Sequence, residues 1–295
     1  MQELAMQPPR ESGALSPPIY SVATIRAKEA FIIDMDGVIY HGNQLLPRVS
    51  EFLRWLVKEE KRFVFLTNSS ERSPKELSQK MKRLGITVGE DHFYTSALST
   101  AGFLASQKPG GTCFVIGEAG LTQALYAAGF SMNEVDPDFV VVGDTRSFGY
   151  EKLVRAIQAV KKGAKLICTN PDISMVGEGG MHPATGALVA PIELVTGKKA
   201  YTLGKPNPLM MRQALKMLKA RREDTVIIGD RMDTDIIAGI ESEITTCLVL
   251  SGVTSREELD QFAYQPSIIL DGIADILPPP SRPASPVRGG PQTLK

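Results

Sequence analysis

The feature that most restricts the fold is a short apolar run that ends in two carboxylates and a glycine. Its sequence is Phe31-Ile32-Ile33-Asp34-Met35-Asp36-Gly37, and a run of this length is typical of a strand buried in a parallel sheet. Strand side chains alternate with a period of two, so Asp34 and Asp36 lie on one face. In an open α/β sheet, ligands bind at the carboxyl ends of the strands. The run therefore predicts a parallel sheet with a reactive site at this end, although Asp and Gly also form ordinary turns.

Polar side chains recur where other apolar runs end. Thr67-Asn68-Ser69 follows residues 63–66, and Gly229-Asp230 follows residues 225–228, with Asp235 a little further on. Lys205 lies in a Gly-Lys-Pro turn ahead of an expected helix. Because the carboxyl ends of parallel strands share one edge of a sheet, we expect these groups to meet Asp34. The strands expected in the middle of the chain are interpreted as lacking acidic ends.

Helical patterns alternate with these runs. Apolar residues recur at helical spacing over residues 49–57 behind Pro47, and Ser73-Pro74-Lys75-Glu76 is a capping box with proline at the first helical position. Alternating strands and helices indicate helices on both faces of a parallel sheet. We therefore expect an α/β fold, with a doubly wound, Rossmann-like parallel-sheet core and an inserted α/β cap domain.

The expected domain boundaries follow from where the pattern changes. Residues 25–108 and 200–277 are assigned to the core, and residues 109–199 to the inserted cap. Residues 1–24 and the Pro-rich residues 278–295 are expected to be disordered tails. Within the cap, residues 172–183 form a glycine-rich stretch that is expected to be a loop without helix or strand.

Composition excludes some classes of partner. The chain has 33 basic and 33 acidic residues, which are interspersed, so neither nucleic acid nor an anionic membrane is expected to bind. The N-terminal residues have no hydrophobic signal core. The 3 cysteines lie in apolar, strand-like stretches, which favours reduced thiols over a disulfide framework. We therefore expect a cytoplasmic protein.

An acidic cluster at adjacent strand ends needs a cation. Close carboxylates raise one another's pKa values unless positive charge is present, and hard oxygen ligands favour Mg²⁺ held together with a substrate phosphate. Lys205, the Thr67 hydroxyl and the Asn68 amide would complete a site that binds a phosphoryl group. Each helper also has a simpler explanation, since Thr67 and Asn68 suit a turn and Asp235 suits a helix cap.

At these residues the chain resembles the haloacid dehalogenase superfamily of phosphatases. The four motifs of that family correspond to Asp34-Met35-Asp36-Gly37, Thr67-Asn68-Ser69, Lys205-Pro206, and Gly229-Asp230 with Asp235. Other stretches are most similar to the NagD-type nucleotide phosphatases, among them Asp138-Phe139-Val140-Val141-Val142-Gly143, Thr169-Asn170-Pro171-Asp172 and Leu250-Ser251-Gly252-Val253. The resemblance extends from about residue 29 to residue 277.

The resemblance implies a function for each motif residue. Asp34 would be the nucleophile that takes the phosphoryl group as an aspartyl-phosphate, and Asp36 would be the general acid and base. Thr67, Asn68 and Lys205 would bind the phosphoryl group. Asp34, the backbone carbonyl of Asp36, and Asp230 would hold Mg²⁺, and Asp235 would organise the groups around it.

The cap is expected to select the substrate. In NagD relatives a cap loop covers the site, and the corresponding residues here are about 172–183. Asn170, Asp172 and His182 are the candidate substrate contacts. Arg231 departs from the family pattern, which frequently has asparagine after the motif aspartate. A homodimer through the cap is a further expectation.

Several functions remain as alternatives. The leading hypothesis is a Mg²⁺-dependent phosphomonoesterase for small phosphorylated metabolites, with nucleoside monophosphates first. The alternatives are a phosphatase for sugar phosphates, phosphoglycolate or pyridoxal phosphate, and a non-catalytic binding paralogue on the same fold. A dehalogenase is disfavoured, because Asp36 supplies an acid/base that ester hydrolysis requires.

Overall fold

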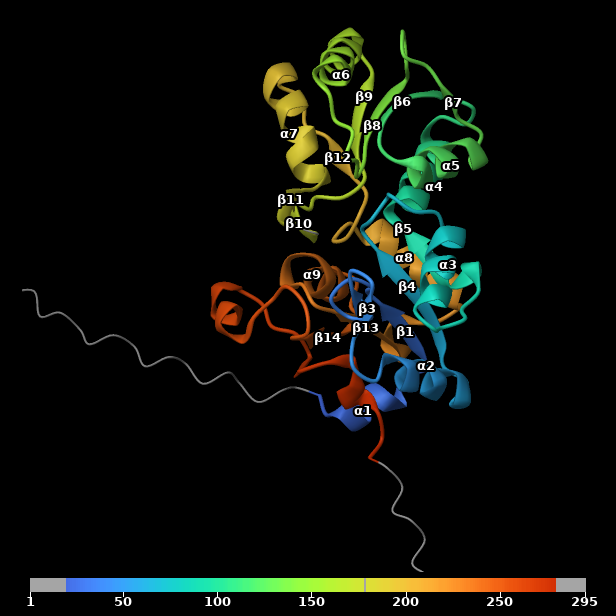
Figure 1. Ribbon diagram of the computed structural model, residues 1–295, viewed down its shortest axis with the longest axis vertical. Coiled ribbons are helices and arrows are strands. Elements are labelled where there is room, and N and C mark those ends of the chain that lie inside the picture. Colours follow the sequence, from blue (N-terminus) through green and yellow to red (C-terminus); the bar gives the residue numbers. More distant parts are fainter. Residues whose placement is uncertain (1–19, 178, 280–295) are drawn as a thin grey trace, which may run out of the picture.

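The computed structural model describes residues 20–177 and 179–279, which form two stacked lobes, each with its own parallel sheet (Figure 1). The neighbouring strands of the larger sheet are, in order, β15 (Ile268–Leu270), β14 (Thr245–Val249), β13 (Thr225–Gly229), β1 (Ala30–Ile33), β4 (Arg62–Thr67) and β5 (Phe93–Thr95). Those of the smaller sheet are β12 (Tyr201–Thr202), β9 (Lys165–Cys168), β8 (Phe139–Val142), β6 (Thr112–Ile116) and β7 (Ser131–Met132).

Helices cover both faces of the larger sheet because its strand side chains alternate between two apolar clusters. Phe31 and Ile33 of β1 pack into a cluster with the helices α1 (Val22–Ala27), α2 (Val49–Lys58) and α3 (Pro74–Arg83). Ile32 faces the other way, into a cluster with α8 (Pro208–Leu218) and α9 (Ile237–Glu241). The short helical segments of this lobe are η1 (Glu90–His92), η2 (Arg222–Asp224), η3 (Met232–Ile236, a π-helix), η4 (Arg256–Gln261) and η5 (Ile273–Ile276).

The smaller sheet is covered in the same way. Val141 of β8 packs into a cluster with α4 (Ser96–Gln107) and α5 (Ala119–Ala127). Val140 and Val142 pack into a cluster on the opposite face with α6 (Tyr150–Lys162) and α7 (Thr185–Thr196). These layers confirm the predicted α/β fold with parallel sheets between flanking helices.

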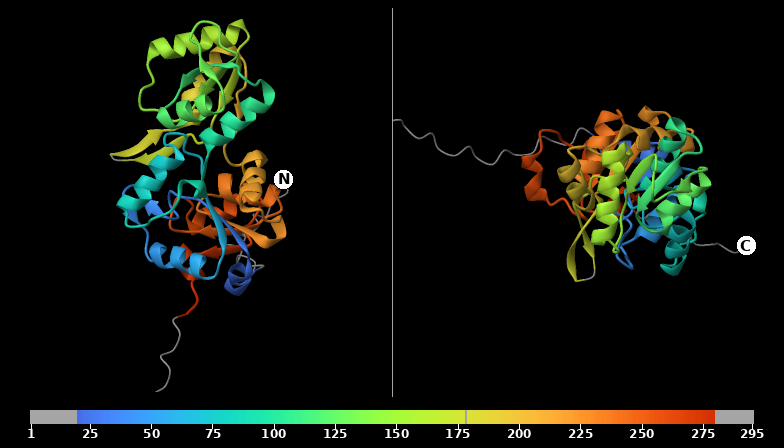
Figure 2. Two further views of the ribbon diagram at one scale, coloured as in Figure 1. Left: turned by 90° about the vertical axis from the view of Figure 1, so that its right-hand side faces the viewer. Right: turned by 90° about the horizontal axis from the view of Figure 1, so that it is seen from above.

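The expected loop at residues 172–183 is instead a β-hairpin. β10 (Ser174–Gly177) pairs antiparallel with β11 (Gly180–Pro183), with Met175 opposite His182. Gly179 and Gly180 have φ values of 88° and 120° at the turn, a conformation that glycine adopts without strain. The prediction treated the glycines as a sign of irregularity, whereas they form the turn between two short strands. The hairpin projects where the two lobes meet (Figure 2).

The packing differs from the expected boundaries at three places. Tyr201 of β12 pairs with Ile167 of β9, so residues 201–202 belong to the smaller sheet rather than to the core segment expected from residue 200. Helix α4, which was assigned to the core, packs Ala101 and Leu104 against the apolar side chains of α5. The start of α1 lies within the expected N-terminal tail of residues 1–24, because Ser21 caps that helix. Residues 1–19 of that tail, and residues 280–295, lie outside the described residues.

The order of the larger sheet places three strand ends side by side. β1 pairs with β13 on one side and with β4 on the other, all parallel. The chain moves from β1 to β4 in one direction and returns to β13 in the other, so β1 lies at the switch point of the sheet. Asp34, Asp230 and Thr67 stand at the ends of these strands, where open α/β sheets bind ligands. A hairpin of β2 (Tyr40–His41) and β3 (Gln44–Leu45) follows β1.

Candidate active site

Lys205 lies at the centre of the strand ends. Its Nζ donates to Asp34 Oδ1 at 2.5 Å, to Asp235 Oδ1 at 2.6 Å and to the carbonyl of Leu66 at 3.2 Å. The residue is only 2% exposed. Burial lowers the pKa of Lys205, but the Asp235 and Asp34 carboxylates outweigh that effect and raise it. The side chain is therefore a fixed, fully charged donor with all three ammonium hydrogens directed at oxygen atoms.

Asp34 and Asp36 occupy different surroundings although they stand two residues apart. Asp34 is buried, and burial raises its pKa well above the usual value, with Lys205 opposing the shift. Asp36 is exposed at the same strand end. The protein around Asp36 still displaces enough water to raise its pKa, and Lys80 and Arg72 oppose that effect. Both pKa values are raised, so the two carboxyl groups differ in exposure and in partner: Asp36 can exchange a proton with a ligand, while Asp34 is held against the Lys205 ammonium group.

Asp230 is enclosed by backbone. Its Oδ2 accepts a hydrogen bond from the backbone N–H of Val253 at 2.7 Å. Burial raises the pKa of Asp230 to about 6, and the Asp235 carboxylate adds to the shift. The chain can approach so closely because two neighbours lack side chains: a Cβ on Gly252 would lie 1.9 Å from Asp230 Oδ2, and one on Gly37 would lie 2.4 Å from it.

Three of the carboxylates could share a cation. Asp34, Asp230 and Asp235 each offer an oxygen atom, and these atoms all lie within 4.8 Å of one another. Lys205 is paired with Asp34 and Asp235, while Asp230 has no basic partner among the described residues. One ammonium group against three carboxylates leaves negative charge in a buried place, which disfavours ionisation unless a further cation is present. The donor set and its charge fit a hard divalent metal ion.

Thr67 and Asn68 are placed differently from each other. Thr67 Oγ1 accepts a hydrogen bond from the Ser69 N–H at 3.1 Å, so the hydroxyl shapes the turn and keeps its own proton for another acceptor. Asn68 binds the backbone of Lys205 on both sides: its Oδ1 accepts from the Lys205 N–H at 2.7 Å and its Nδ2 donates to the Lys205 carbonyl at 3.0 Å. The Asn68 side chain therefore positions Lys205.

The candidate cap residues are divided between two places. Asn170 is buried, and its Nδ2 donates to the Asn68 carbonyl at 2.9 Å and to Thr185 Oγ1 at 3.0 Å, so it joins the lobes. Asp172 Oδ2 accepts from Asn68 Nδ2 at 3.3 Å. His182 lies on β11 with an exposed side chain. Only Asp172 of the three borders the pocket between the lobes.

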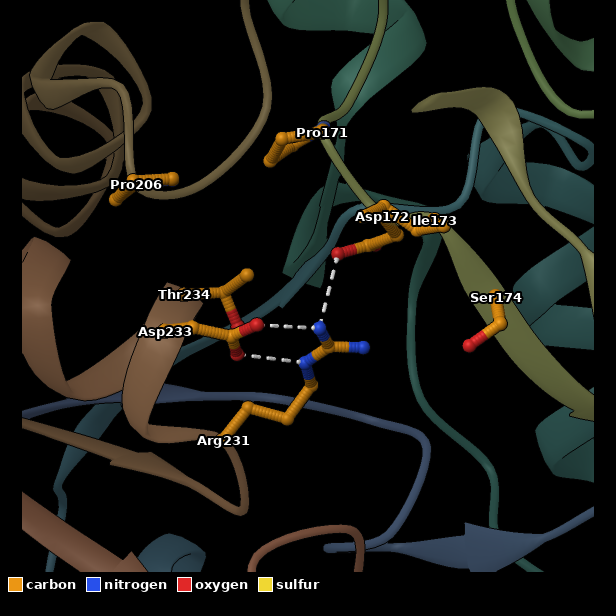
Figure 3. A pocket seen from close by; sticks show the side chains of 8 residues that line it. All are labelled: Pro171, Asp172, Ile173, Ser174, Pro206, Arg231, Asp233 and Thr234. Carbon is orange, nitrogen blue, oxygen red and sulfur yellow. Dashed lines mark hydrogen bonds and ion pairs between the residues drawn. The ribbon is translucent and has the colours of Figure 1, made fainter. Parts of the chain in front are cut away.

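That pocket has a volume of about 450 Å³. It is lined by residues 171–174 from the smaller lobe and by Pro206, Arg231, Asp233 and Thr234 from the larger one (Figure 3). The Arg231 guanidinium crosses it, in a bidentate ion pair with Asp233 and 3.7 Å from Asp172 Oδ1. Asp172 accepts a hydrogen bond from Asn68, and Asn68 in turn binds the backbone of Lys205, so the pocket lies beside the acidic centre.

Comparison with known proteins identifies this arrangement. Residues 31–131 match the model of the haloacid dehalogenase-like hydrolase family, and residues 202–276 match a related HAD-hydrolase-like model. The chain is 41% identical over 247 residues to a dihydroxyacetone phosphatase of Corynebacterium glutamicum, covering 84% of this chain and 90% of the relative. The chain belongs to the haloacid dehalogenase-like hydrolases.

Solved structures place it within that family. NagD from Escherichia coli K-12 superposes with a TM-score of 0.79 at 40% identity, covering 85% of this chain and 100% of NagD. A 4-nitrophenylphosphatase from Thermotoga maritima superposes with a TM-score of 0.82 at 33% identity, covering 86% of this chain and 97% of that one. This haloacid dehalogenase-like hydrolase is a phosphatase of the NagD type, which confirms the resemblance stated from the motifs.

Sequence reasoning missed one buried group of this hydrolase. Asp144 follows β8, so the interpretation that the middle strands lack acidic ends is wrong. Its Oδ2 accepts from the Ser70 N–H at 2.8 Å and its Oδ1 accepts from Thr185 Oγ1 at 2.5 Å, which ties the lobes together next to Asn68. The signal was present, since Gly143-Asp144 follows an apolar run in the same way as Gly229-Asp230.

Among the described residues, none of the helices combines the length and the apolar character needed to cross a bilayer. The dihydroxyacetone phosphatase and the 4-nitrophenylphosphatase described above take their names from small phosphorylated molecules.

Proposed function

We propose that this chain is a Mg²⁺-dependent phosphomonoesterase that works through an aspartyl-phosphate. The observation that carries the proposal is the contact of buried Lys205 with Asp34 and Asp235, next to Asp230. A carboxylate that is held by an ammonium group and lies beside a cation site is an activated nucleophile for phosphorus, because both charges stabilise the incoming phosphoryl oxygens. The metal would be held by Asp34, Asp230 and the backbone carbonyl of Asp36.

The side chains then divide the chemistry. Asp34 attacks phosphorus and becomes the aspartyl-phosphate, while the exposed Asp36 gives a proton to the departing alkoxide and later removes one from the attacking water. The Thr67 hydroxyl donates to the phosphoryl oxygens, whose negative charge spreads in the transition state, and the positive charge of Lys205 beside Asp34 stabilises the same oxygens. Asn68 acts by holding Lys205, and Asp235 by holding its ammonium group. Mg²⁺ supplies further positive charge to the same oxygens when it is bound.

Nucleoside monophosphates are the first substrate class that we propose. The proposal rests on relatives named ribonucleotide monophosphatase NagD, 41% identical, and 5'-nucleotidase YutF of Bacillus subtilis, 34% identical. Sugar phosphates are the second class, supported by relatives named acid sugar phosphatase at 36% identity. Phosphoglycolate and pyridoxal phosphate remain lesser alternatives, and the presence of Asp34, Asp36, Lys205 and Asp230 together disfavours a non-catalytic paralogue.

Metal dependence tests the acidic centre. EDTA should abolish release of inorganic phosphate from a panel of nucleotides and sugar phosphates, and Mg²⁺ should restore it. Ca²⁺ should support little turnover, because it is larger and takes a looser, more variable coordination shell. Full activity in EDTA would contradict the assignment of the acidic centre as an essential metal site. A folded protein that hydrolyses no phosphomonoester with Mg²⁺ present would instead favour the binding paralogue.

Replacement of Gly252 by alanine tests the enclosure of Asp230. The new methyl group would overlap Asp230 Oδ2, which lies 1.9 Å from the position of the added Cβ, so the carboxylate must move. A displacement of about 1 Å costs about 10²-fold in rate, and we expect a loss of that order in kcat/KM for an aryl phosphate. Gly102→Ala is the matched control, since its Cβ would meet nothing within 4 Å on helix α4. Equal activity of the two variants would refute the close packing.

The oligomer and the compartment are proposed from two further features. Helix α7 exposes Leu194 and Val195 at 85% and 55%, which supports a homodimer through the cap. Light scattering after gel filtration measures this, and a monomer at micromolar concentration would reject it. The 3 cysteines are all buried as free thiols, which supports the expected location in the reducing cytoplasm.

A further inference from the structure

Arg231 links the acidic centre to the pocket between the lobes. It follows Asp230 directly, and its backbone N–H donates to Asp235 Oδ2 at 3.3 Å. Its side chain extends away from the centre into the pocket, where it faces Asp172 of the smaller lobe (Figure 3). The part of the substrate that leaves with the alkoxide must extend from the phosphoryl group in some direction, and this pocket lies next to that group.

The guanidinium is held in one orientation. Nε donates to Asp233 Oδ1 at 3.0 Å and Nη2 donates to Asp233 Oδ2 at 2.8 Å, which is the parallel two-bond arrangement of an arginine and a carboxylate. Asp172 Oδ1 lies 3.7 Å from Nη2 on the opposite side. A planar guanidinium that is held on two sides keeps its remaining N–H groups in a fixed direction. Arg231 is therefore preorganised to donate a hydrogen bond to a ligand in that direction.

One donor and one acceptor remain for a ligand. Within residues 20–177 and 179–279, Nη1 of Arg231 makes no hydrogen bond, and Figure 3 shows it pointing into the open pocket on the side of Ser174. Asp172 Oδ1 is buried and has no hydrogen bond with any described residue. A buried acceptor that is left unpaired is costly, so a ligand that donates a hydrogen bond to Asp172 Oδ1 is favoured, and the same ligand can accept one from Arg231 Nη1.

The charge of the pocket limits what that ligand can be. Two carboxylates, Asp172 and Asp233, surround one guanidinium, so the group as a whole is not positive. A leaving group with its own negative charge would be repelled by the carboxylates, while hydroxyl groups can donate to Asp172 and accept from Arg231.

We infer that Arg231, together with Asp172, is a specificity-determining residue that selects uncharged, hydroxyl-bearing leaving groups and disfavours acidic ones. The inference rests on the proposed phosphomonoesterase function and narrows it. Among the substrate classes considered above, nucleoside monophosphates and sugar phosphates fit this pocket, and phosphoglycolate does not.

Three substrates with six-carbon chains test the inference. Sorbitol 6-phosphate carries hydroxyl groups, 6-phosphogluconate replaces the terminal alcohol by a carboxylate, and hexyl phosphate has neither. We expect the native enzyme to have its highest kcat/KM with sorbitol 6-phosphate. Arg231→Met keeps the length of the side chain and removes the donor, so the ratio of kcat/KM for sorbitol 6-phosphate over hexyl phosphate should fall by about tenfold or more. Arg231→Lys keeps the positive charge but lacks the planar guanidinium, so its kcat/KM ratio should lie between those of the native enzyme and Arg231→Met.

Two further variants separate selection from folding. Asp172→Asn removes one negative charge from the pocket. The ratio of kcat/KM for 6-phosphogluconate over sorbitol 6-phosphate should therefore rise by about threefold or more. Arg146→Met removes an exposed arginine elsewhere on the smaller lobe and should leave every ratio unchanged.

The outcomes are distinct. An equal loss on all three substrates in Arg231→Met would mean that the residue only holds the lobes together, and a native preference for 6-phosphogluconate would also overturn the inference. If the native protein hydrolyses none of the three, nor an aryl phosphate, the proposed function itself fails.

Discussion

Replacement of Lys205 by methionine is expected to abolish phosphatase activity and to lower the free energy of unfolding by about 3–5 kcal/mol, the cost of leaving one partner of a buried ion pair behind. Lys205 is 2% exposed and satisfies two carboxylates at once, at 2.5 and 2.6 Å. Methionine fills a similar volume but leaves Asp34 and Asp235 without their shared counter-charge. Urea unfolding in EDTA measures the loss without metal binding.

The loss of stability in Lys205→Met should depend on pH. Asp34 has a raised pKa in the native enzyme, with Lys205 opposing the shift, so removal of Lys205 raises it further. A carboxyl whose folded pKa lies above its unfolded value gives stability that is present at low pH and is lost as pH rises through the folded pKa. The difference from the native protein should therefore be larger at pH 7.5 than at pH 5.

Lys198→Met is the matched control for that experiment. Lys198 is exposed in the turn after α7, so its loss should change neither activity nor the unfolding midpoint appreciably. A Lys205→Met protein with native stability and no dependence on pH would mean that the three charges are not coupled as their distances indicate.

Replacement of Asp34 by asparagine has the other large expected effect. The amide is nearly isosteric but cannot attack phosphorus, so kcat should fall by about 10⁵-fold or more, the order seen when an enzyme loses its nucleophile. The fold should survive, because Lys205 keeps Asp235 as a partner and Asp34 carries a destabilising buried charge. Thermal unfolding and circular dichroism establish that the variant is folded before its rate is measured.

Asp36→Asn is the informative comparison, because it retains the nucleophile and removes the acid and base. General acid help contributes about 10²–10⁴-fold, and it matters most when the leaving group needs a proton. The deficit of this variant should therefore be large for alkyl phosphates and smaller for an activated aryl phosphate. Equal deficits on both would place Asp36 outside proton transfer.

The sequence predicts the centre of this molecule well because its signals are local. The apolar run before Asp34 and Asp36 predicts the buried strand that ends just ahead of them, and parallel strand order brings Asp230 and Thr67 to the same edge. The capping box at Ser73 likewise needs only neighbouring residues, and α3 begins there as predicted.

The features that were missed depend on contacts between distant residues. Asn68 suits a phosphate ligand by type, yet its amide binds the backbone of Lys205, which is 137 positions away. Tyr201 stands next to a core motif, but its pairing with β9 assigns it to the smaller lobe. The position of Arg231 between Asp233 and Asp172 depends on how the two lobes meet. Local pattern contains none of these relations.

The measurement that tests the central claim most directly is acid quenching of the enzyme during turnover of a ³²P-labelled aryl phosphate with Mg²⁺. The native protein and Asp36→Asn should retain protein-bound label that is stable to acid and released by hydroxylamine, with more in Asp36→Asn, because attack of water on the aspartyl-phosphate also needs that base. Peptide mapping should place the label on Asp34, and Asp34→Asn should carry none. Label on the Asp34→Asn protein, or at another residue of the native enzyme, would contradict the assignment of Asp34 as the nucleophile.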